Sequence, residues 1–407
     1  ALALGGESGP VVVELADDES AFASADVDAA PPPAPADVEA VAGRLTSSRR
    51  PVVLAGQGAA GAAGEVRRIV ARVGAGVLAT TSGRGVVPED DLRSLVVDAA
   101  GREGDAVNAF LAEADLVLAL GCKFSHNGTL GYRLRAEVDR LVHVDAADAS
   151  LAAGGASVRI RADVPDFMRA LLAALPDTEQ EGWAVDALAA QRRALLAAAA
   201  AADRTEPALR GVDGGGAAFF GALREALPRE GVLAADSGLH QQLVRRHFRV
   251  LEPRTLLVPA DFQSMGFGLP AAVGAAHARP DRSVVAVVGD GGFAMSGLEL
   301  LTAVRDRLPV TVVVFNDGHL GLIRVEQLAR YGRTTAVGAV TPDLELFARS
   351  VGARYARVEG DSEAVLRRSV ESAEPTLVEV VADDPPGLRE LRAAGRARRL
   401  VRSLRRR

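Results

Sequence analysis

Short, mainly apolar runs, each six or seven residues long and separated by stretches with a helical pattern, constrain the fold of this chain more than any other feature. Continuous runs of Val, Leu, Ile and Ala are typical of strands buried on both faces, and strands that alternate with helices are typical of parallel sheets. The sequence therefore predicts an α/β protein with two doubly wound parallel-sheet domains. The expected strands are residues 50–55, 76–81, 115–120, 140–145, 231–236, 283–289, 310–315 and 376–381.

The length of 407 residues allows two or three domains. Residues 9–15 read as a buried strand that needs neighbours from a further domain, and the proline-rich stretch after it reads as an extended linker. We expect the end of a preceding domain at 1–18, a linker at 19–36, the first α/β domain at 37–176, a linker helix at 177–214, the second α/β domain at 215–386 and a basic tail at 387–407.

Composition and charge limit the classes of function. Hydrophobic residues make up 48% of the chain and charged residues 25%, which is typical of a folded protein. The net charge of −6 gives no reason to expect a nucleic-acid partner, and no apolar run reaches the ~18 residues of a membrane span. The only cysteine, Cys122, excludes an intrachain disulfide and favours a reducing, cytoplasmic compartment.

The tail differs in charge from the rest of the chain. Residues 387–407 contain nine Arg and one Glu, so they carry about +8, and residues 1–386 carry about −14. We expect a solvated extension. An amphipathic helix that binds a membrane surface or RNA is the alternative, since Leu388, Leu391, Val401 and Leu404 fall roughly on one stripe.

The sharpest chemical signal is Gly289-Asp290-Gly291, which is followed after 24 intervening residues by Asn316-Asp317-Gly318-His319. Each motif directly follows an expected strand, and ligands bind at the carboxyl ends of the strands in open α/β sheets. Glycines let backbone N–H groups approach phosphate oxygens, while carboxylates are ligands that Mg²⁺ prefers. Either motif alone would be read as a tight turn, but together they predict a diphosphate and metal site.

These motifs resemble the signature of the thiamine diphosphate enzymes of the acetolactate synthase and 2-oxo acid decarboxylase type. The segments 236–242, 264–271 and 320–323 resemble neighbouring parts of the same family. The resemblance implies bound thiamine diphosphate, with Met265 supporting its bent conformation, and Mg²⁺ held by Asp290, Asp317 and the backbone oxygen of His319. It implies cofactor contacts from Gly238, His240, Met265, Gly289, Asp290, Gly291, Gly292, Asp317, His319, Leu320, Gly321 and Leu322.

The first α/β block resembles the central, Rossmann-like domain of that family at 50–58, 85–90 and 141–145, and the second resembles its diphosphate-binding domain. Residues 9–15 resemble the last strand of the N-terminal pyrimidine-binding domain. In the family that domain supplies the catalytic glutamate, so we assign no catalytic residue here. We expect a fragment of a longer protein, or one subunit of a split enzyme, which works as a homodimer or homotetramer.

A rival motif lies in the first block. Gly56-Gln-Gly58-Ala-Ala-Gly61 is a literal G-x-G-x-x-G between a strand and a helix, which by itself predicts a dinucleotide site. The next strand ends at 79–82 without an acid to hold a ribose, which argues against an NAD(P) dehydrogenase. Acetolactate synthases hold FAD in this domain, but the family's Arg and Asp residues are replaced in segment 121–127, so FAD stays an open question.

The leading hypothesis is a thiamine diphosphate- and Mg²⁺-dependent carboligase that decarboxylates a small 2-oxo acid and transfers the two-carbon unit to a second carbonyl. A non-oxidative 2-oxo acid decarboxylase shares every motif named above and is the first alternative. A catalytically silent scaffold or regulatory subunit that binds the cofactor is the alternative from another class.

Overall fold

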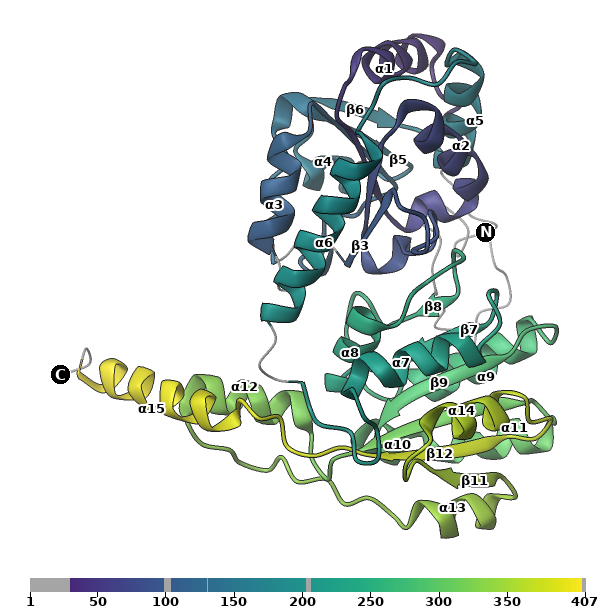
Figure 1. The fold of residues 1–407 in the computed structure, drawn as a ribbon, viewed down its shortest axis with the longest axis vertical. Helices are drawn as coiled ribbons and strands as arrows, with labels where there is room; N and C mark the ends of the chain where they lie inside the picture. The colour runs from purple at the N-terminus through teal and green to yellow at the C-terminus, as the bar shows by residue number, and fades with distance from the viewer. Residues whose placement is uncertain (1–29, 99–103, 130, 203–205, 405–407) are drawn as a thin grey trace, which may run out of the picture. The chain divides into compact units, whose positions relative to one another are not determined.

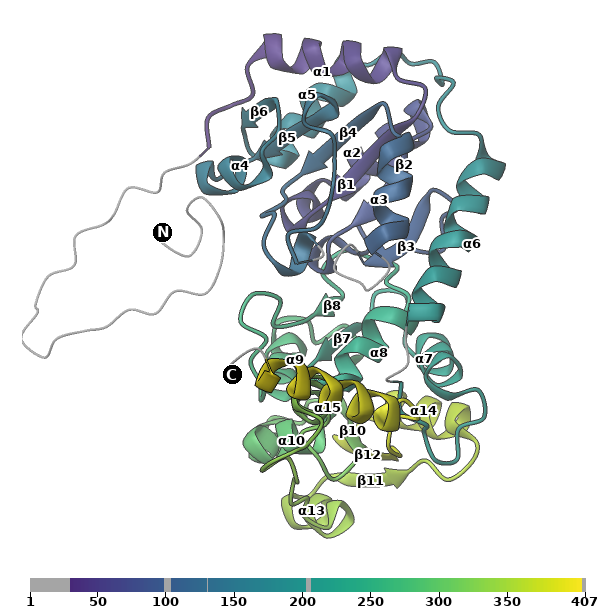
Figure 2. The ribbon, with the colours of Figure 1, turned by 90° about the vertical axis from the view of Figure 1, so that its left-hand side faces the viewer.

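The computed structural model describes residues 30–98, 104–129, 131–202 and 206–404. The chain divides into two compact units, residues 1–196 and 197–407, and each contains one parallel sheet between layers of helices (Figures 1 and 2). The predicted strand at 9–15, the domain end at 1–18 and most of the linker at 19–36 lie outside the described residues.

The first unit is a Rossmann-like α/β fold. Its described strands form a parallel sheet in the order β3-β2-β1-β4-β5-β6, which is the order of dinucleotide-binding domains. The strands are β1 Pro51–Ala55, β2 Gly76–Ala79, β3 Ser94–Asp98, β4 Leu116–Leu120, β5 Leu141–Asp145 and β6 Val158–Arg161. The helices are α1 Pro35–Ser47, α2 Ala63–Val73, α3 Gly104–Glu113, α4 Asp148–Gly154, α5 Val164–Ala174 and α6 Val185–Ala202, of which α6 continues past the end of this unit at residue 196.

Alternate residues of the strands in the first unit face two separate cores. Val53 and Leu118 pack with α1, α2 and α5 on one face of the sheet. Leu54 and Val117 pack with α3 and Trp183 on the other face. Both faces of the sheet are therefore covered, as the continuous apolar runs predict.

The second unit carries a parallel sheet in the order β11-β12-β10-β9-β7-β8 among its described residues. Its strands are β7 Val232–Ala235, β8 Leu256–Leu257, β9 Val284–Gly289, β10 Val310–Asn316, β11 Arg354–Arg357 and β12 Thr376–Val381. Its helices are α7 Gly215–Ala226, α8 Leu239–His247, α9 Gly268–Ala278, α10 Asp290–Ser296, α11 Leu300–Arg305, α12 Gly321–Tyr331, α13 Leu344–Val351, α14 Ser362–Val370 and α15 Leu388–Leu404. The predicted fold class, two doubly wound parallel-sheet domains, is confirmed.

The winding of the second sheet reverses next to β7. From β7 the chain passes outward to β8, whereas β9 leads in the other direction to β10. In open α/β sheets the carboxyl ends of strands at such a reversal form the crevice in which ligands bind. The fold therefore predicts a site after β7, β9 and β10.

Helix ends in this unit follow ordinary capping chemistry. The side chains of Asp343 and Asp361 accept hydrogen bonds from the backbone N–H groups of Leu346 and Ala364, which begins α13 and α14. Helix α13 ends at Gly352, whose φ of 81° lies in the left-handed region that favours glycine.

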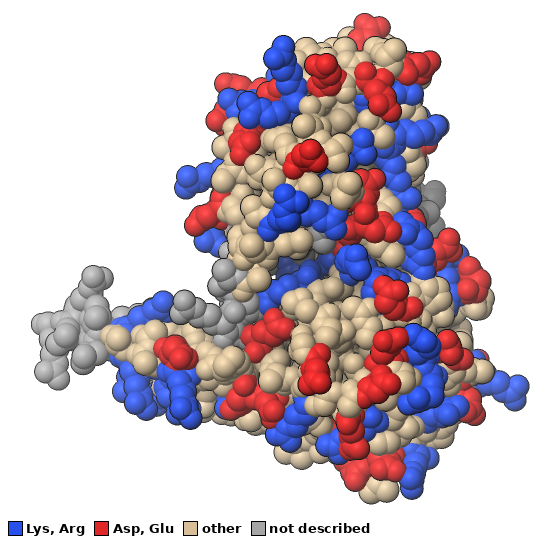
Figure 3. All heavy atoms as spheres, viewed as in Figure 1, with Lys and Arg blue, Asp and Glu red and all other residues tan. Residues whose placement is uncertain are grey.

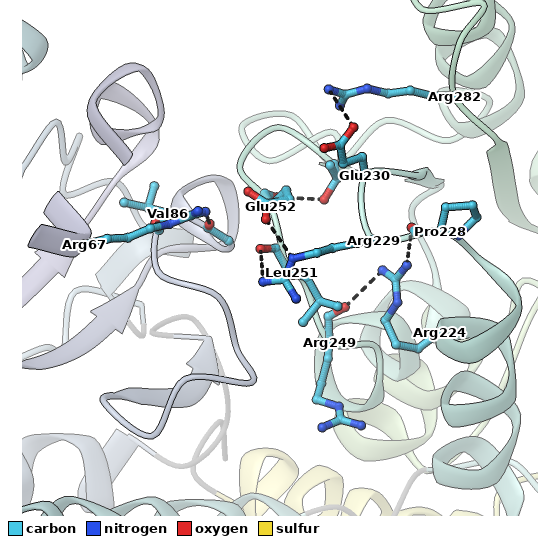
Figure 4. Close-up of polar contacts among 12 residues, drawn as sticks. Arg67, Val86, Arg224, Pro228, Arg229, Glu230, Arg249, Leu251, Glu252 and Arg282 are labelled. Carbon is cyan, nitrogen blue, oxygen red and sulfur yellow. Dashed lines mark hydrogen bonds and ion pairs between the residues drawn. The ribbon is translucent and has the colours of Figure 1, made fainter. Parts of the chain in front are cut away.

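A buried arginine fixes the turn between α7 and β7 (Figure 4). The Arg224 guanidinium donates hydrogen bonds to the carbonyl oxygens of Leu227, Pro228 and Arg249, and it lies over the ring of Phe248. Burial lowers the pKa of Arg224. Three carbonyl acceptors offset the cost of burying this charge.

The C-terminal segment departs from the expected solvated extension, because residues 388–404 form helix α15 and pack on α12. The two helices approach closely at a pair of glycines. A Cβ atom at Gly395 would lie 2.1 Å from the carbonyl oxygen of Leu328 and 2.4 Å from the nitrogen of Gly332. Leu388 and Leu391 pack beside α12, and Figure 3 shows arginine side chains gathered along α15.

No helix among the described residues is both long enough and apolar enough to cross a bilayer.

Candidate active site

All twelve residues that the sequence singles out as cofactor contacts line one pocket in the second unit. The pocket has a cavity volume of about 170 Å³ and lies at the carboxyl ends of β7, β9 and β10. Seven further residues also line it, namely Pro207, Ser237, Leu239, Gln263, Phe315, Ile323 and Ala382. Segments that are far apart in the sequence thus meet at the reversal of the sheet.

Glycines after β9 are required by close packing. A Cβ atom at Gly291 would lie 2.6 Å from Cδ2 of Leu320, and one at Gly292 would lie 2.1 Å from Oδ2 of Asp236. Both distances are too short for any larger residue without a shift of the neighbours. The floor of the pocket is consequently formed by backbone, which leaves room for a ligand to approach it.

Asp290 is almost fully buried, with 2% of its surface exposed, and its carboxylate accepts three hydrogen bonds. Oδ1 accepts a hydrogen bond of 2.7 Å from the backbone N–H of Gly291, and Oδ2 accepts one of 2.8 Å from the N–H of Gly318. The Thr341 hydroxyl donates to the same Oδ2 at 3.0 Å. Burial nevertheless raises the pKa of Asp290.

Asp317 follows β10 in a tight turn. Its Oδ1 accepts a hydrogen bond of 2.8 Å from the N–H of His319, and Gly318 between them has a φ of 69°. Burial, and then the negative charge of Asp290, raise the pKa of Asp317 to about 6. Two neighbouring carboxyls that resist ionisation together form a site that a cation would stabilise.

The donor set fits a hard cation such as Mg²⁺ that is completed by a ligand. Among the described residues no three or more His, Cys, Asp or Glu side chains are grouped to hold a metal ion by themselves. Asp290, Asp317 and the backbone carbonyl of His319 supply oxygen only, and a bound diphosphate and water would have to supply the rest.

His240 presents an unsatisfied polar atom at the pocket. The ring is 7% exposed and stacks at 6.3 Å on Phe315, and its Nε2 has no hydrogen-bond partner among the described residues. Burial lowers the pKa of His240 to about 4, so the ring is neutral at pH 7. An unpartnered ring nitrogen at the pocket wall fits a polar ligand there.

Asp236 is a site residue that the sequence reasoning did not single out. Its buried carboxylate accepts hydrogen bonds from the backbone N–H groups of Gly266 and Phe267, at 2.9 and 3.1 Å. These bonds fix the loop that carries Met265 against the end of β7. An acid at the end of the expected strand 231–236, directly before Ser-Gly, was the available signal.

Glycines of the G-x-G-x-x-G motif in the first unit serve loop packing. The N–H of Gly56 donates to the carbonyl oxygen of Leu120 at 2.8 Å, and the N–H of Gly58 donates to that of Gly121 at 3.2 Å. A Cβ atom at Gly56 would lie 2.0 Å from the oxygen of Gly121. The N–H groups of Gly56 and Gly58 are thus engaged within the first unit, and both glycines allow close packing of this loop against residues 120–121.

Comparisons with known proteins agree with this arrangement. Residues 38–171 match the family model described as thiamine pyrophosphate enzyme, central domain. Residues 236–380 match the model described as thiamine pyrophosphate enzyme, C-terminal TPP binding domain.

Similar curated proteins are named acetolactate synthases. A probable acetolactate synthase large subunit of Methanocaldococcus jannaschii is 29% identical over 393 residues, which cover 91% of this chain and 64% of that protein. Acetolactate synthase 1, chloroplastic, of Zea mays is 29% identical over 93% of this chain and 63% of its own length. The acetolactate synthase of Bacillus subtilis is 37% identical over 40% of this chain and 29% of its own length.

The chain thus spans less than two thirds of the length of these relatives. The first matched region contains every described strand of the first sheet, and the second runs from the end of β7 into β12. The second region includes all residues that line the pocket except Pro207 and Ala382. This chain belongs to the thiamine pyrophosphate enzymes, of which it carries the central domain and the C-terminal domain.

Proposed function

We propose that this chain is the cofactor-holding part of a thiamine diphosphate- and Mg²⁺-dependent carboligase of the acetolactate synthase type. The observation that carries the proposal is the convergence of twelve expected contact residues on one pocket around the buried pair Asp290 and Asp317. The names of the similar proteins support the choice of reaction. The substrate we propose is a small 2-oxo acid such as pyruvate.

The residues of this chain divide into a polar end and an apolar end of the pocket. Asp290, Asp317 and the carbonyl of His319 would hold Mg²⁺, and the glycine backbone after β9 would lie against the diphosphate. Met265, Leu320 and Leu322 line the rest of the pocket and would exclude water from the reacting atoms. Bound thiamine diphosphate supplies a carbon nucleophile and an electron sink for decarboxylation of the 2-oxo acid.

His240 has a defined task in this arrangement. Its imidazole is neutral at pH 7 because burial lowers its pKa to about 4. A neutral ring can accept or donate one hydrogen bond at Nε2, depending on its tautomer. We infer that His240 orients a polar group of the cofactor or substrate and carries no charge while doing so.

We assign the role of catalytic acid or base to none of the described residues. We propose that a glutamate of a pyrimidine-binding domain has this role. The working form would then be a homodimer or homotetramer. FAD is left out of the proposal because the Arg and Asp residues of the family are replaced in segment 121–127. The buried, unpaired Cys122 is compatible with a cytoplasmic location.

The test is product analysis of the complete protein with pyruvate, thiamine diphosphate and Mg²⁺. Acetolactate supports the carboligase, whereas acetaldehyde as the product shows a decarboxylase. Cofactor binding without either product identifies a scaffold. Asp290→Ala should abolish cofactor binding, and an Asp213→Ala variant, which removes an exposed acid of the same unit, is the matched control.

A further inference from the structure

A continuous line of polar side chains runs from Asp290 to the edge of the second sheet. The Thr341 hydroxyl lies 3.0 Å from Oδ2 of Asp290 and 3.4 Å from Oδ1 of Asn316. Asn316 donates from Nδ2 to Oε1 of Glu379 at 2.8 Å, and the Tyr355 hydroxyl donates to Oε2 of Glu379 at 2.6 Å. Side chains from three strands, β10, β11 and β12, therefore hold the Asn316 amide in place next to the loop residue that touches Asp290.

The orientation of each group in this line is determined. Asn316 must direct its amide nitrogen toward the carboxylate of Glu379, so its amide oxygen faces Thr341. Both groups facing the Thr341 hydroxyl are acceptors, and a hydroxyl has one proton. The shorter contact, to Asp290, is the one that this proton satisfies.

Backbone contacts hold Thr341 in place from a second direction. Residues 337–339 pair with the turn that carries Asp317 and His319 through an isolated bridge between His319 and Gly338. The N–H of Leu320 donates to the oxygen of Val337 at 2.8 Å, and the N–H of Ala339 donates to that of Gly318 at 2.9 Å. The segment that ends at Thr341 is thus attached to the turn after β10, while its hydroxyl reaches the turn after β9.

We propose that Thr341 is a positioning residue for the cation site, which fixes the Asp290 carboxylate relative to the turn of Asp317. The inference rests on the proposed function. A carboxylate held by one side-chain hydroxyl and two backbone N–H groups cannot rotate freely, so its remaining lone pairs keep one direction. Outer partners of this kind contribute about 10–100-fold to metal affinity.

The experiment measures metal affinity separately from catalysis. Mn²⁺ is titrated into the complete protein at saturating thiamine diphosphate and followed by electron paramagnetic resonance, for wild type, Thr341→Val and Thr341→Ser. We expect Thr341→Val, which keeps the shape and loses the donor, to weaken Mn²⁺ binding about 10–100-fold. Thr341→Ser should restore affinity to within a few-fold of wild type.

A matched control separates positioning from general destabilisation. Thr376→Val makes the same chemical change at the buried amino end of β12, where the hydroxyl donates to the oxygen of Glu374, and it should leave Mn²⁺ affinity unchanged. Equal Mn²⁺ affinity in wild type and Thr341→Val overturns the positioning role, and so does failure of Thr341→Ser to restore affinity. If wild type itself binds neither thiamine diphosphate nor Mn²⁺, the proposed function fails.

Discussion

Replacing Asp317 with Asn should stabilise the metal-free protein. Above its pKa the Asp317 carboxyl is ionised in a partly buried place next to the carboxylate of Asp290, and this ionisation destabilises the folded state. Burial and the charge of Asp290 raise the pKa of Asp317 from 3.8 to about 6. At 1.36 kcal/mol per pH unit the difference corresponds to about 3 kcal/mol, and partial exposure of Asp317 reduces our expectation to about 2–3 kcal/mol at pH 8. Asn keeps the ligand oxygen and removes the charge.

The pH dependence of this stabilisation has a definite sign. Folded Asp317 binds its proton more tightly than the unfolded chain does, so between pH 3.8 and about 6 the folded state holds more protons. Raising the pH through this window therefore lowers the stability of the wild type and leaves the Asn variant unaffected at this position. The advantage of the variant should fall to about half at pH 5 compared with pH 8.

Differential scanning calorimetry in EDTA at pH 5 and pH 8 measures the effect. For a unit of this size, 2–3 kcal/mol corresponds to roughly 4–12 °C in the Tm of the second unit. Asp213→Asn, at an exposed position of the same unit, should shift the Tm by less than about 1 °C. Equal Tm values for wild type and Asp317→Asn at pH 8, or an advantage that grows on acidification, would refute the electrostatic reasoning.

Three further outcomes are expected. Arg84→Met should cost about 3–5 kcal/mol, because it removes the hydrogen bonds of 2.6 and 2.8 Å that the guanidinium donates to the Glu89 carboxylate in a pair whose side chains are 3–4% exposed. Denaturant titrations followed by Trp183 fluorescence measure the loss, and the double variant with Glu89→Leu should recover part of it. Gly395→Ala should increase amide hydrogen exchange in α15, since its Cβ would lie 2.1 Å from the carbonyl oxygen of Leu328, and this clash outweighs the better helix propensity of Ala. Gly43→Ala, which has open space around it, should not destabilise α1. Gly292→Ala should weaken binding of thiamine diphosphate in calorimetric titrations, because its Cβ would lie 2.1 Å from Oδ2 of Asp236, which the N–H of Gly266 holds in place. Gly274→Ala, which meets nothing within 4 Å, should bind normally.

The interior strands were predictable from the sequence and the edge strands were not. Each of the eight expected strands is present, and the four that were missed, β3, β6, β8 and β11, are the edge strands of the two sheets. An edge strand is covered less completely, so it needs no continuous apolar run. In β11 only Tyr355 and Ala356 are even half-buried, and β8 has two residues. Neither β8 nor β11 shows a pattern of apolar residues from which a strand could be predicted.

Site residues were predictable where one short motif contains both the turn and the side chains that would bind the cofactor or the metal. Gly289–Gly292 and Asp317–Leu322 carry both the turn and the side chains, so their spacing after strands was enough to place them in one pocket. Thr341 and Asp236 act through contacts with residues far along the chain, and a single sequence does not encode such pairings locally. The apolar stripe of α15 with Leu388 and Leu391 was visible in the sequence, but the sequence did not show that this stripe packs on α12.

The close packing of α15 on α12 at Gly332 and Gly395 limits how the C-terminal segment of this chain can be altered. Leu388 and Leu391 belong to the same apolar cluster as Leu239 and Leu322, which both line the pocket. A truncation, fusion or affinity tag that displaces residues 388–404 would remove the outer support of one pocket wall. Deletion of residues 388–404 should therefore lower the affinity of the pocket for its ligand.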